Sequence, residues 1–569
     1  MTSPKLASQS IVLTAILAST LALLAQACSS GGATQPGDPE PDPDPTPPAT
    51  SFALALSSDK LPVLTGSSAT IEVTLTRTSG FDGAVTLTPA GLPPLATASF
   101  APETLAAGQT KSTLTVTAPA GTPHSLPTAV TIRGAAGNKQ VTKPLTVTIT
   151  GAPGSLDTSF GATGGKVLIP AGASDDYALA MAVQPDGKIV AVGRAAENRT
   201  DFAVMRLERD GALDATFGPS TSPGKVLTDF GASSDIAYAV AVQPDGKIVV
   251  AGNTIVAGSG LDFAVARYNA DGSLDTTFGS GGKLTTAFSA DSDTAYALLL
   301  QPDGKIVVGG DSNQGSSGTG IDYALARYNT DGTLDATFGQ SSTPGKVTTA
   351  LAAFSGRDSI YSLTLQTVAG EARIVAAGGE GDFSVARYLP NGTLDATFGA
   401  AGTGKVTALM GSSIGAARAV RVAADDKIVL AGHVSGEFAL VRLDAGGRVD
   451  GAFGSSGKVI TPVPSSRDAE AQGLAIDGDG KIIVAGWATE ANSSAGNFAV
   501  LRYLTDGQLD TTFGGTGMVI TPMAEGTRAD QGNAILLQTD DRIPAVRVLV
   551  AGQANAGSNY DFAVARYWR

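Results

Sequence analysis

The sequence is poor in the side chains that most often carry chemistry. Its 569 residues include one cysteine, Cys28, and two histidines, His124 and His433. A single cysteine excludes an internal disulfide and a thiolate metal cluster. Two histidines far apart in the chain argue against a histidine-rich zinc or copper site.

Charged residues are also scarce, and basic residues are the minority. They make up 16% of the chain, with 38 Lys and Arg against 52 Asp and Glu, for a formal net charge of -14. Nucleic-acid binding is driven by Lys and Arg that neutralise phosphates, so the composition predicts no nucleic-acid partner. The acidic surplus is interpreted as a contribution to solubility. The length predicts several domains or a repeat array, and we expect a monomer.

The N-terminus has the pattern of a secretory signal. Lys5 is followed by an uncharged run at residues 11–27 that is short for a membrane span. LLAQAC at residues 23–28 resembles a bacterial lipoprotein signal, although Ala25 stands where that family usually has Leu. The resemblance implies that residues 1–27 are a signal peptide and that Cys28 carries a lipid anchor. An ordinary signal peptide with an incidental cysteine is the alternative.

The residues after the signal bear on location and spacing. By the same resemblance, Ser29 implies sorting to the outer membrane, so we expect a lipid-anchored protein at the outer membrane or cell surface. Residues 28–50 are rich in Pro and Asp without apolar periodicity, which predicts a disordered, extended tether.

Residues 51–151 alternate apolar and polar side chains between Gly, Pro and Ser breaks, as in ATIEVTLTRT at 69–78. This pattern predicts about seven short strands in an antiparallel sandwich. The segment resembles the immunoglobulin-like modules of bacterial surface proteins, and that resemblance implies a spacer.

From residue 155 to residue 569 the chain repeats itself seven times. The motif LDxxFG, with the variant VDGAFG, places one phenylalanine in each copy: Phe160, Phe217, Phe278, Phe338, Phe398, Phe453 and Phe513. A second motif, DFAVARY and its variants, begins at residues 201, 262, 322, 382, 437, 497 and 561. Self-similarity at such a period is typical of solenoids, propellers and arrays.

Each copy contains four short segments of strand-like composition. In the second copy these are residues 237–243, 247–252, 263–269 and 282–288. Four antiparallel strands repeated seven times predict an all-β protein with a seven-bladed β-propeller. The array begins with a fourth-strand segment and ends with a third-strand segment. We therefore predict that residues 165–170 complete the sheet of the C-terminal strands and close the ring.

The repeat motifs closely resemble the delta-60 repeat family of bacterial β-propellers. LDxxFG, QPDGKIVVAG and DFAVARY carry this resemblance, which covers residues 155–569. It implies a propeller on a secreted or surface protein and implies no particular reaction. The fourth copy departs from the pattern at residues 366–375, and the seventh carries an insertion within residues 538–550.

The most regular polar residues are interpreted as structural. Asp186, Asp245 and Asp303 stand in PDG turns, where Pro and Gly set the backbone and Asp bonds the turn. The loops on the opposite face, between second and third strands and between fourth and first strands, vary from copy to copy. Binding residues are commonly found on loops held by a rigid scaffold, so this variable face is the candidate functional face.

One set of acids recurs on the variable face. An Asp stands eight residues before the Gln position of QPDG in five copies: Asp176, Asp235, Asp293, Asp358 and Asp530. Two interpretations stay open. Either these carboxylates ring the mouth of the central channel and hold a cation such as Ca²⁺, or they bond the backbone at the start of each strand. No other cofactor is predicted.

Three functions are compatible with this organisation. The leading hypothesis is a lipid-anchored cell-envelope protein whose propeller binds or scaffolds a protein or a glycan. The alternatives are a propeller enzyme, acting as a hydrolase or lyase through carboxylates alone, and a passive structural component of the envelope. Scarce histidines and the absence of a nucleophile motif argue against an enzyme, and no catalytic residue is assigned.

Overall fold

The computed structural model describes residues 51–569 except 79, 126, 197–198, 232–233, 316–319, 352–356, 412–413, 490–494, 525–528, 541–542 and 556. The predicted signal, Cys28 and the tether lie outside the described residues. The elements of the described part are all strands. Within that part, no helix has the length and hydrophobicity of a membrane span.

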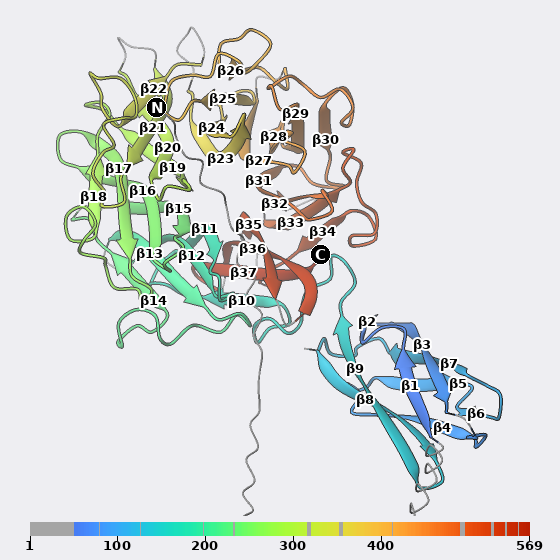
Figure 1. Ribbon diagram of the computed structural model, residues 1–569. Helices are drawn as coiled ribbons and strands as arrows, with labels where there is room; N and C mark the ends of the chain where they lie inside the picture. Colours follow the sequence, from blue (N-terminus) through green and yellow to red (C-terminus); the bar gives the residue numbers. More distant parts are fainter. Residues whose placement is uncertain are drawn as a thin grey trace, which may run out of the picture. The chain divides into compact units, whose positions relative to one another are not determined.

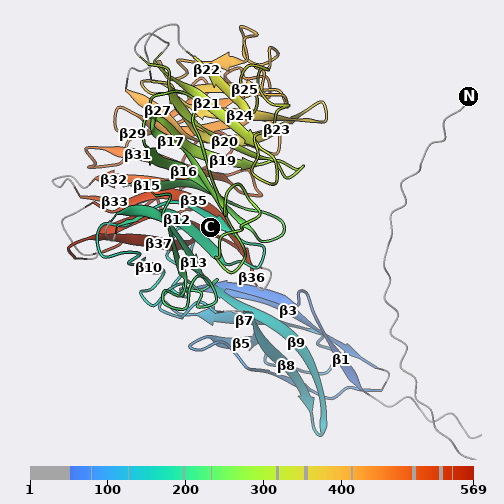
Figure 2. The same cartoon turned by 90° about the vertical axis from the view of Figure 1, so that its left-hand side faces the viewer.

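The N-terminal strands form two sheets that share one apolar core. One sheet has the order β1 (Phe52–Leu56), β3 (Ser67–Arg77), β7 (Lys111–Ala118) and β5 (Thr97–Ala101). The other has the order β2 (Lys60–Leu64), β9 (Lys139–Thr150), β8 (Thr128–Ala136), β4 (Val85–Ala90) and β6 (Thr104–Leu105). Figure 2 shows β8 and β9 as a long hairpin.

This part differs from the expectation in two ways. It has nine strands rather than about seven, because short pieces such as the two-residue β6 pair at the sheet edges. One pair, β2 with β9, is parallel rather than antiparallel. Alternation nevertheless marks the core faces correctly: Val73, Leu75, Leu114 and Val116 are buried against one another, with polar residues between them.

Seven four-stranded antiparallel sheets follow, and within each the strands pair in spatial order from first to fourth. The first strands are β11 (Tyr177–Val183), β15 (Asp235–Val242), β19 (Asp293–Leu300), β23 (Ile360–Val368), β27 (Gly415–Val422), β31 (Ala469–Ile476) and β35 (Gln531–Asp540). The second strands are β12 (Ile189–Ala196), β16 (Ile248–Val256), β20 (Ile306–Asn313), β24 (Glu371–Gly378), β28 (Ile428–Val434), β32 (Ile482–Thr489) and β36 (Ile543–Asn555).

The third and fourth strands lie farther from the centre of the array (Figure 1). The third strands are β13 (Thr200–Leu207), β17 (Gly260–Tyr268), β21 (Ile321–Tyr328), β25 (Ser384–Tyr388), β29 (Glu437–Leu443), β33 (Gly496–Tyr503) and β37 (Tyr560–Trp568). The fourth strands are β14 (Lys225–Thr228), β18 (Lys283–Thr286), β22 (Lys346–Thr349), β26 (Lys405–Val406), β30 (Lys458–Thr461), β34 (Met518–Thr521) and β10 (Lys166–Ile169).

The ring of first strands is closed. Each first strand contacts the next one along the chain, and β35 contacts β11. The predicted pairing of the two ends is confirmed, because β10 pairs with β37 in the sheet order β10-β37-β36-β35. Closure covers edges that would otherwise be open to pairing with another chain.

Three sequence motifs meet in one buried cluster in each sheet. In the β15–β18 sheet, Arg267 Nε donates to Asp275 Oδ2 at 2.8 Å, and Lys247 Nζ lies 2.9 Å from the same oxygen. The guanidinium lies over the Phe278 ring, 4.5 Å from its centroid. The corresponding pairs are Arg206–Asp214, Arg327–Asp335, Arg387–Asp395, Arg442–Asp450, Arg502–Asp510 and Arg566–Asp157.

This cluster supports the structural interpretation of DFAVAR and LDxxFG. Arg267 Nη1 also donates to the Thr330 carbonyl in the next sheet, at 2.5 Å, so the cluster joins neighbouring sheets. The PDG segments form tight turns as expected: Gly246 has a φ of 85°, and Lys247 N donates to Asp245 Oδ1 at 3.1 Å.

Candidate functional site

Every first strand carries a β-bulge at the same place. In β15 the pairing with β16 shifts between Ala237 and Ala239, so that Tyr238 is an extra residue. The extra residues of the seven strands are Leu179, Tyr238, Tyr296, Tyr361, Arg418, Gln472 and Asn533. A bulge bends a strand locally and redirects the side chain that it carries. We call these seven residues the bulge ring.

A glycine opposite each bulge makes room for it. A Cβ on Gly252 would overlap the carbonyl oxygen of Ile236, which the bulge directs toward β16. The other glycines with the same close approach are Gly193, Gly310, Gly378, Gly432, Gly486 and Gly552. This packing explains why the second strand reads KIVVAG, with Gly at its sixth position.

The bulge ring lines a central cavity of about 200 Å³ that is open to solvent. All seven of its side chains are half-buried, so each retains a face toward the cavity. The first strands contribute further apolar lining, including Val240, Leu298 and Leu474. The surface that the cavity exposes is nevertheless mainly polar, so the cavity offers hydrogen-bonding groups beside a smaller apolar area.

The bulge ring is not chemically uniform around the cavity. Tyr238, Tyr296 and Tyr361 are neighbours, with ring centroids 5.0 Å and 5.2 Å apart. The Arg418 guanidinium continues this row, 4.3 Å from the Tyr361 centroid. Burial raises the pKa of all three tyrosines, which stay neutral at ordinary pH. The opposite part of the ring carries amides, at Gln472 and Asn533.

More polar groups lie close to the bulge ring. They belong to the residues two places before each bulge and to the second-strand residues that pair with these. The Arg194 guanidinium lies over the Tyr177 ring, 4.1 Å from its centroid. Ser359 Oγ donates to Asp311 Oδ2 at 2.6 Å, and burial raises the pKa of Asp311 to about 6.

His433 and Glu470 form a second polar pair at equivalent positions. Glu470 lies two places before the bulge residue Gln472, and His433 pairs with the residue two places before Arg418. His433 Nδ1 lies 3.8 Å from Glu470 Oε2, and Gln472 Nε2 donates to that oxygen at 2.9 Å. Burial lowers the pKa of His433, and nearby Arg418 lowers it further against the opposing effect of Glu470. The imidazole is therefore neutral at neutral pH.

The five acids singled out in the sequence lie at strand starts with their carboxylates bonded to the backbone. Asp176 Oδ2 accepts from the N–H groups of Ala171 and Gly172, both at 2.7 Å. The bonds of the other four acids are Phe230 N to Asp235 at 2.8 Å, Phe288 N to Asp293 at 2.7 Å, Leu351 N to Asp358 at 2.9 Å and Met523 N to Asp530 at 2.7 Å. The residues lining the central cavity do not include these five.

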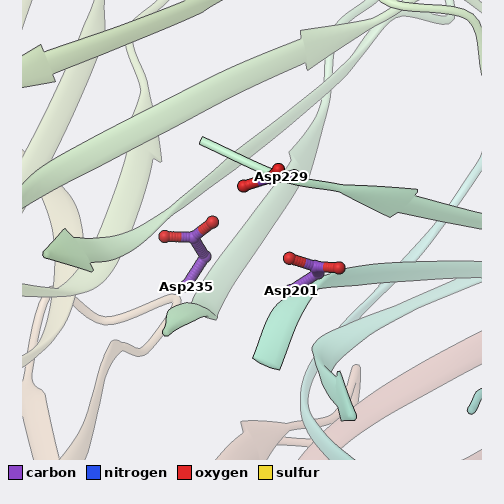
Figure 3. Close-up of side chains that lie close together, drawn as sticks. All are labelled: Asp201, Asp229 and Asp235. Atoms are coloured by element: carbon purple, nitrogen blue, oxygen red, sulfur yellow. The ribbon is translucent and has the colours of Figure 1, made fainter. Parts of the chain in front are cut away.

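One of the five also belongs to a cluster of carboxylates. Asp201, Asp229 and Asp235 have oxygens within 4.8 Å of one another (Figure 3), an arrangement of ligand type and spacing suited to a cation such as Ca²⁺. Burial raises the pKa of Asp235, and the charge of Asp229 raises it further. Asp235 already accepts bonds from Phe230 N and Thr254 Oγ1, which occupy part of its capacity for a metal.

Sequence reasoning missed the bulge ring, although a signal for it was present. Each ring residue lies between two small or apolar residues, three places after the acid position, as in Asp235 and Tyr238. That place changes from Leu to Tyr, Arg, Gln and Asn while the surrounding motif repeats. A variable position inside a repeated motif marks a surface that the scaffold does not need.

Comparison with known families gives one informative match. Six segments match the family model described as a domain of unknown function (DUF5122) beta-propeller. They are residues 184–217, 243–278, 301–338, 367–398, 423–453 and 478–513. Each segment runs from the PDG region to the phenylalanine of LDxxFG or its variant, so it contains the second and third strands of one sheet. No curated protein matches the chain.

Similarity to solved structures is weak. Domains 4 and 5 of the S-layer protein SbsC are 31% identical over 17% of this chain, and the match covers 53% of that structure with a TM-score of 0.14. Domains 4–9 of the same protein are 13% identical, with 91% of this chain and 82% of that one covered and a TM-score of 0.15. An ICAM-5 D1–D4 ectodomain fragment gives 10% identity, 91% and 99% coverage and a TM-score of 0.15. TM-scores this low support no inference about this chain.

Proposed function

We propose that this chain, which carries the repeats of a β-propeller family, is a lipid-anchored binding protein of the bacterial cell envelope. The seven four-stranded sheets are proposed to be the blades of one seven-bladed propeller at residues 155–569. Residues 51–151 are proposed to be an immunoglobulin-like spacer, joined through the tether at residues 28–50 to a lipid on Cys28. The ligand is a protein or a glycan that enters the central cavity.

The bulge ring is the observation that carries the binding role. The motifs that hold the sheets together recur almost unchanged, as the Arg267–Asp275–Phe278 cluster and its counterparts illustrate. Seven positions equivalent by fold instead carry five residue types and share one solvent-open cavity. Scaffold packing alone gives no reason for that diversity, whereas recognition of one asymmetric ligand does.

Affinity capture from the native envelope tests this role. The full chain is compared with a variant in which Tyr238, Tyr296 and Tyr361 are all replaced by alanine. The control variant carries Ile460→Ala and Ile520→Ala, which are 49% and 41% exposed on the outer strands. We expect the wild type and the control to retain the same envelope component and the triple variant to lose it. Equal recovery by all three proteins would show that the central cavity is not the binding site.

The anchor has its own test. A Cys28→Ser variant cannot be acylated at that position, and we expect it to leave the membrane fraction and to take up no labelled fatty acid. A single acyl chain binds a membrane only weakly, so stable anchoring requires more than one chain on the cysteine. A wild type that carries no label and is itself absent from the membrane fraction would identify an ordinary signal peptide instead.

A further inference from the structure

We infer that the central cavity binds a uronic acid residue of an acidic polysaccharide, with Arg418 and Arg421 as its carboxylate partners. This inference rests on the proposed binding function and narrows its ligand to one chemical class. It is carried by two arginines that form no ion pair with a carboxylate of the described residues, by a row of tyrosine rings beside them, and by the size of the cavity.

Arg421 lies on β27, lines the cavity and is only partly exposed. Its Nη1 donates to the carbonyl of the adjacent Val420 at 2.8 Å, and no described carboxylate lies within ion-pair distance of its guanidinium. The pKa of Arg421 is lowered by burial, with no acid opposing that shift. A guanidinium stays charged in proteins, so an arginine in such a place calls for an anion.

Arg418 lies three residues earlier on the same strand and faces the same cavity. It stacks on Tyr361, and its buried Nε has no hydrogen-bond partner among the described residues. The contrast with the repeated arginines is direct, because Arg267 and its counterparts each hold an aspartate. Two guanidinium groups on one strand, neither of them ion-paired with an acid in the described part of the chain, form an anion site. A planar guanidinium binds a carboxylate through two parallel hydrogen bonds.

The tyrosine row adds the selectivity for a sugar. Tyr238, Tyr296 and Tyr361 present half-buried rings along one wall of the cavity, ending at Arg418. An aromatic face packs against the apolar C–H face of a pyranose, and the hydroxyls of Tyr238 and Tyr296 suit its polar edge. The Tyr361 hydroxyl already donates to Glu380 Oε1 at 3.2 Å. Gln472 and Asn533 on the other side supply amide oxygens that accept from ring hydroxyls. Their amide nitrogens already donate to other groups: Glu470 for Gln472, and Ala178 and Gln553 for Asn533.

The volume limits what enters. A cavity of about 200 Å³ holds roughly six or seven waters at ~30 Å³ each, which is the size class of one sugar residue. A folded protein segment is too large, and a bare phosphate leaves the tyrosine wall without contact. Because the cavity is open to solvent, the rest of a polysaccharide chain can continue outward from the bound residue.

Calorimetric titration of the full-length protein tests the inference. The probes are tetramers of galacturonic, glucuronic and mannuronic acid, with maltotetraose as the neutral reference and inorganic phosphate as the bare anion. We expect at least one acidic tetramer to bind and Arg418→Gln and Arg421→Gln each to weaken it at least 10-fold. Maltotetraose should bind more weakly and respond to neither substitution, and phosphate should not displace the tetramer.

Two further variants serve as controls, one for the loss of an arginine elsewhere and one for the loss of the guanidinium shape alone. Arg448→Gln, on an exposed turn, is the matched arginine control and should change nothing. Arg421→Lys keeps the charge without the fork, and we expect partial binding with an unchanged melting temperature. If no acidic tetramer binds, if phosphate alone reproduces the effect, or if binding ignores both arginines, the inference is wrong. Capture of an envelope component that is lost in the triple tyrosine variant would then still support the proposed function.

Discussion

Asp311 has a carboxyl group whose burial raises its pKa by more than the neighbouring groups lower it. Burial raises its pKa to about 6, although Ser359 donates a hydrogen bond and Arg357 lies nearby. The unfolded chain titrates near pH 3.9. Between pH 4 and pH 6 the folded protein therefore holds a proton that the unfolded chain has released, and stability falls as pH rises through that window.

The expected result of Asp311→Asn follows from this sign. The amide carries no charge at any pH, so the variant should match the wild type near pH 4 and exceed its unfolding free energy by about 2 kcal/mol at pH 7.5. Urea unfolding across this pH range gives the difference between the two proteins. Asp303→Asn, on an exposed turn, should give no such difference. A difference for Asp311→Asn that is flat with pH would contradict the assignment.

In Asp275 the neighbouring groups lower the carboxyl pKa by more than burial raises it. Although burial alone would raise its pKa, hydrogen bonds from Lys247 and Thr277 and the charge of Arg267 hold that pKa well below the usual range. Replacing Asp275 with Asn leaves Arg267 buried without its anion. We expect a loss of about 3 kcal/mol at neutral pH, shrinking only in strong acid where the wild-type carboxyl is protonated.

Denaturant titration at pH 7 measures this loss. Asp271→Asn is the matched control, because Asp271 lies on an exposed turn four residues earlier and its carboxylate bonds only the local Ser273. Its effect should stay within about 0.5 kcal/mol. Equal effects of the two substitutions would mean that the buried cluster does not hold the sheets together.

At the scale of elements, the bulge of the first strand and the glycine of the second are one structural unit. Gly252→Ala would drive a methyl group into the Ile236 carbonyl and force the bulge at Tyr238 to shift. We expect a destabilisation of at least about 3 kcal/mol. The melting temperature checks this loss, with Gly451→Ala as the control, since no atom lies near its added Cβ. A stable Gly252→Ala variant would show that the bulge adapts freely.

Strands were the part of the fold that the sequence could predict. Alternation and turn residues placed the four strands of the second copy at 237–243, 247–252, 263–269 and 282–288, close to the β15–β18 strands of the structure. Period-two alternation also reports which side of a strand is buried. It does not report a bulge, because one extra residue shifts the pairing with another strand, which is a property of two segments together.

The same limit applies to the candidate site. Spacing located acids such as Asp176 but not the direction of their carboxylates, which bond the preceding loop. The side chains that do line the cavity, including Tyr238 and Arg418, were hidden because isolated aromatic or charged residues in a strand are ordinary. Only the closed ring brings seven positions about sixty residues apart to one place.

At the scale of the whole molecule, closure of the ring makes the two ends of the array interdependent. Arg566 and Asp157 form the seventh buried ion pair from opposite ends of the array, and β10 pairs with β37 from Lys166–Ala565 to Ile169–Phe562. Ending the chain at Asn559 removes β37, which leaves β10 without its partner strand, exposes one edge of β36 and deprives Asp157 of Arg566. Exposed strand edges of this kind pair with other chains.

We therefore expect the truncated protein to lose its cooperative melting transition and to associate into large species in light scattering. Adding a synthetic peptide of residues 560–569 should restore part of the cooperative melting transition, because the peptide can take the place of β37 between β10 and β36. A peptide of the same composition in scrambled order should not. If the truncated chain melted like the full one, each sheet would be stable on its own and the central cavity would not depend on closure. Restoration by the native peptide alone would show that the last strand fixes the ring, and with it the seven side chains that face the channel.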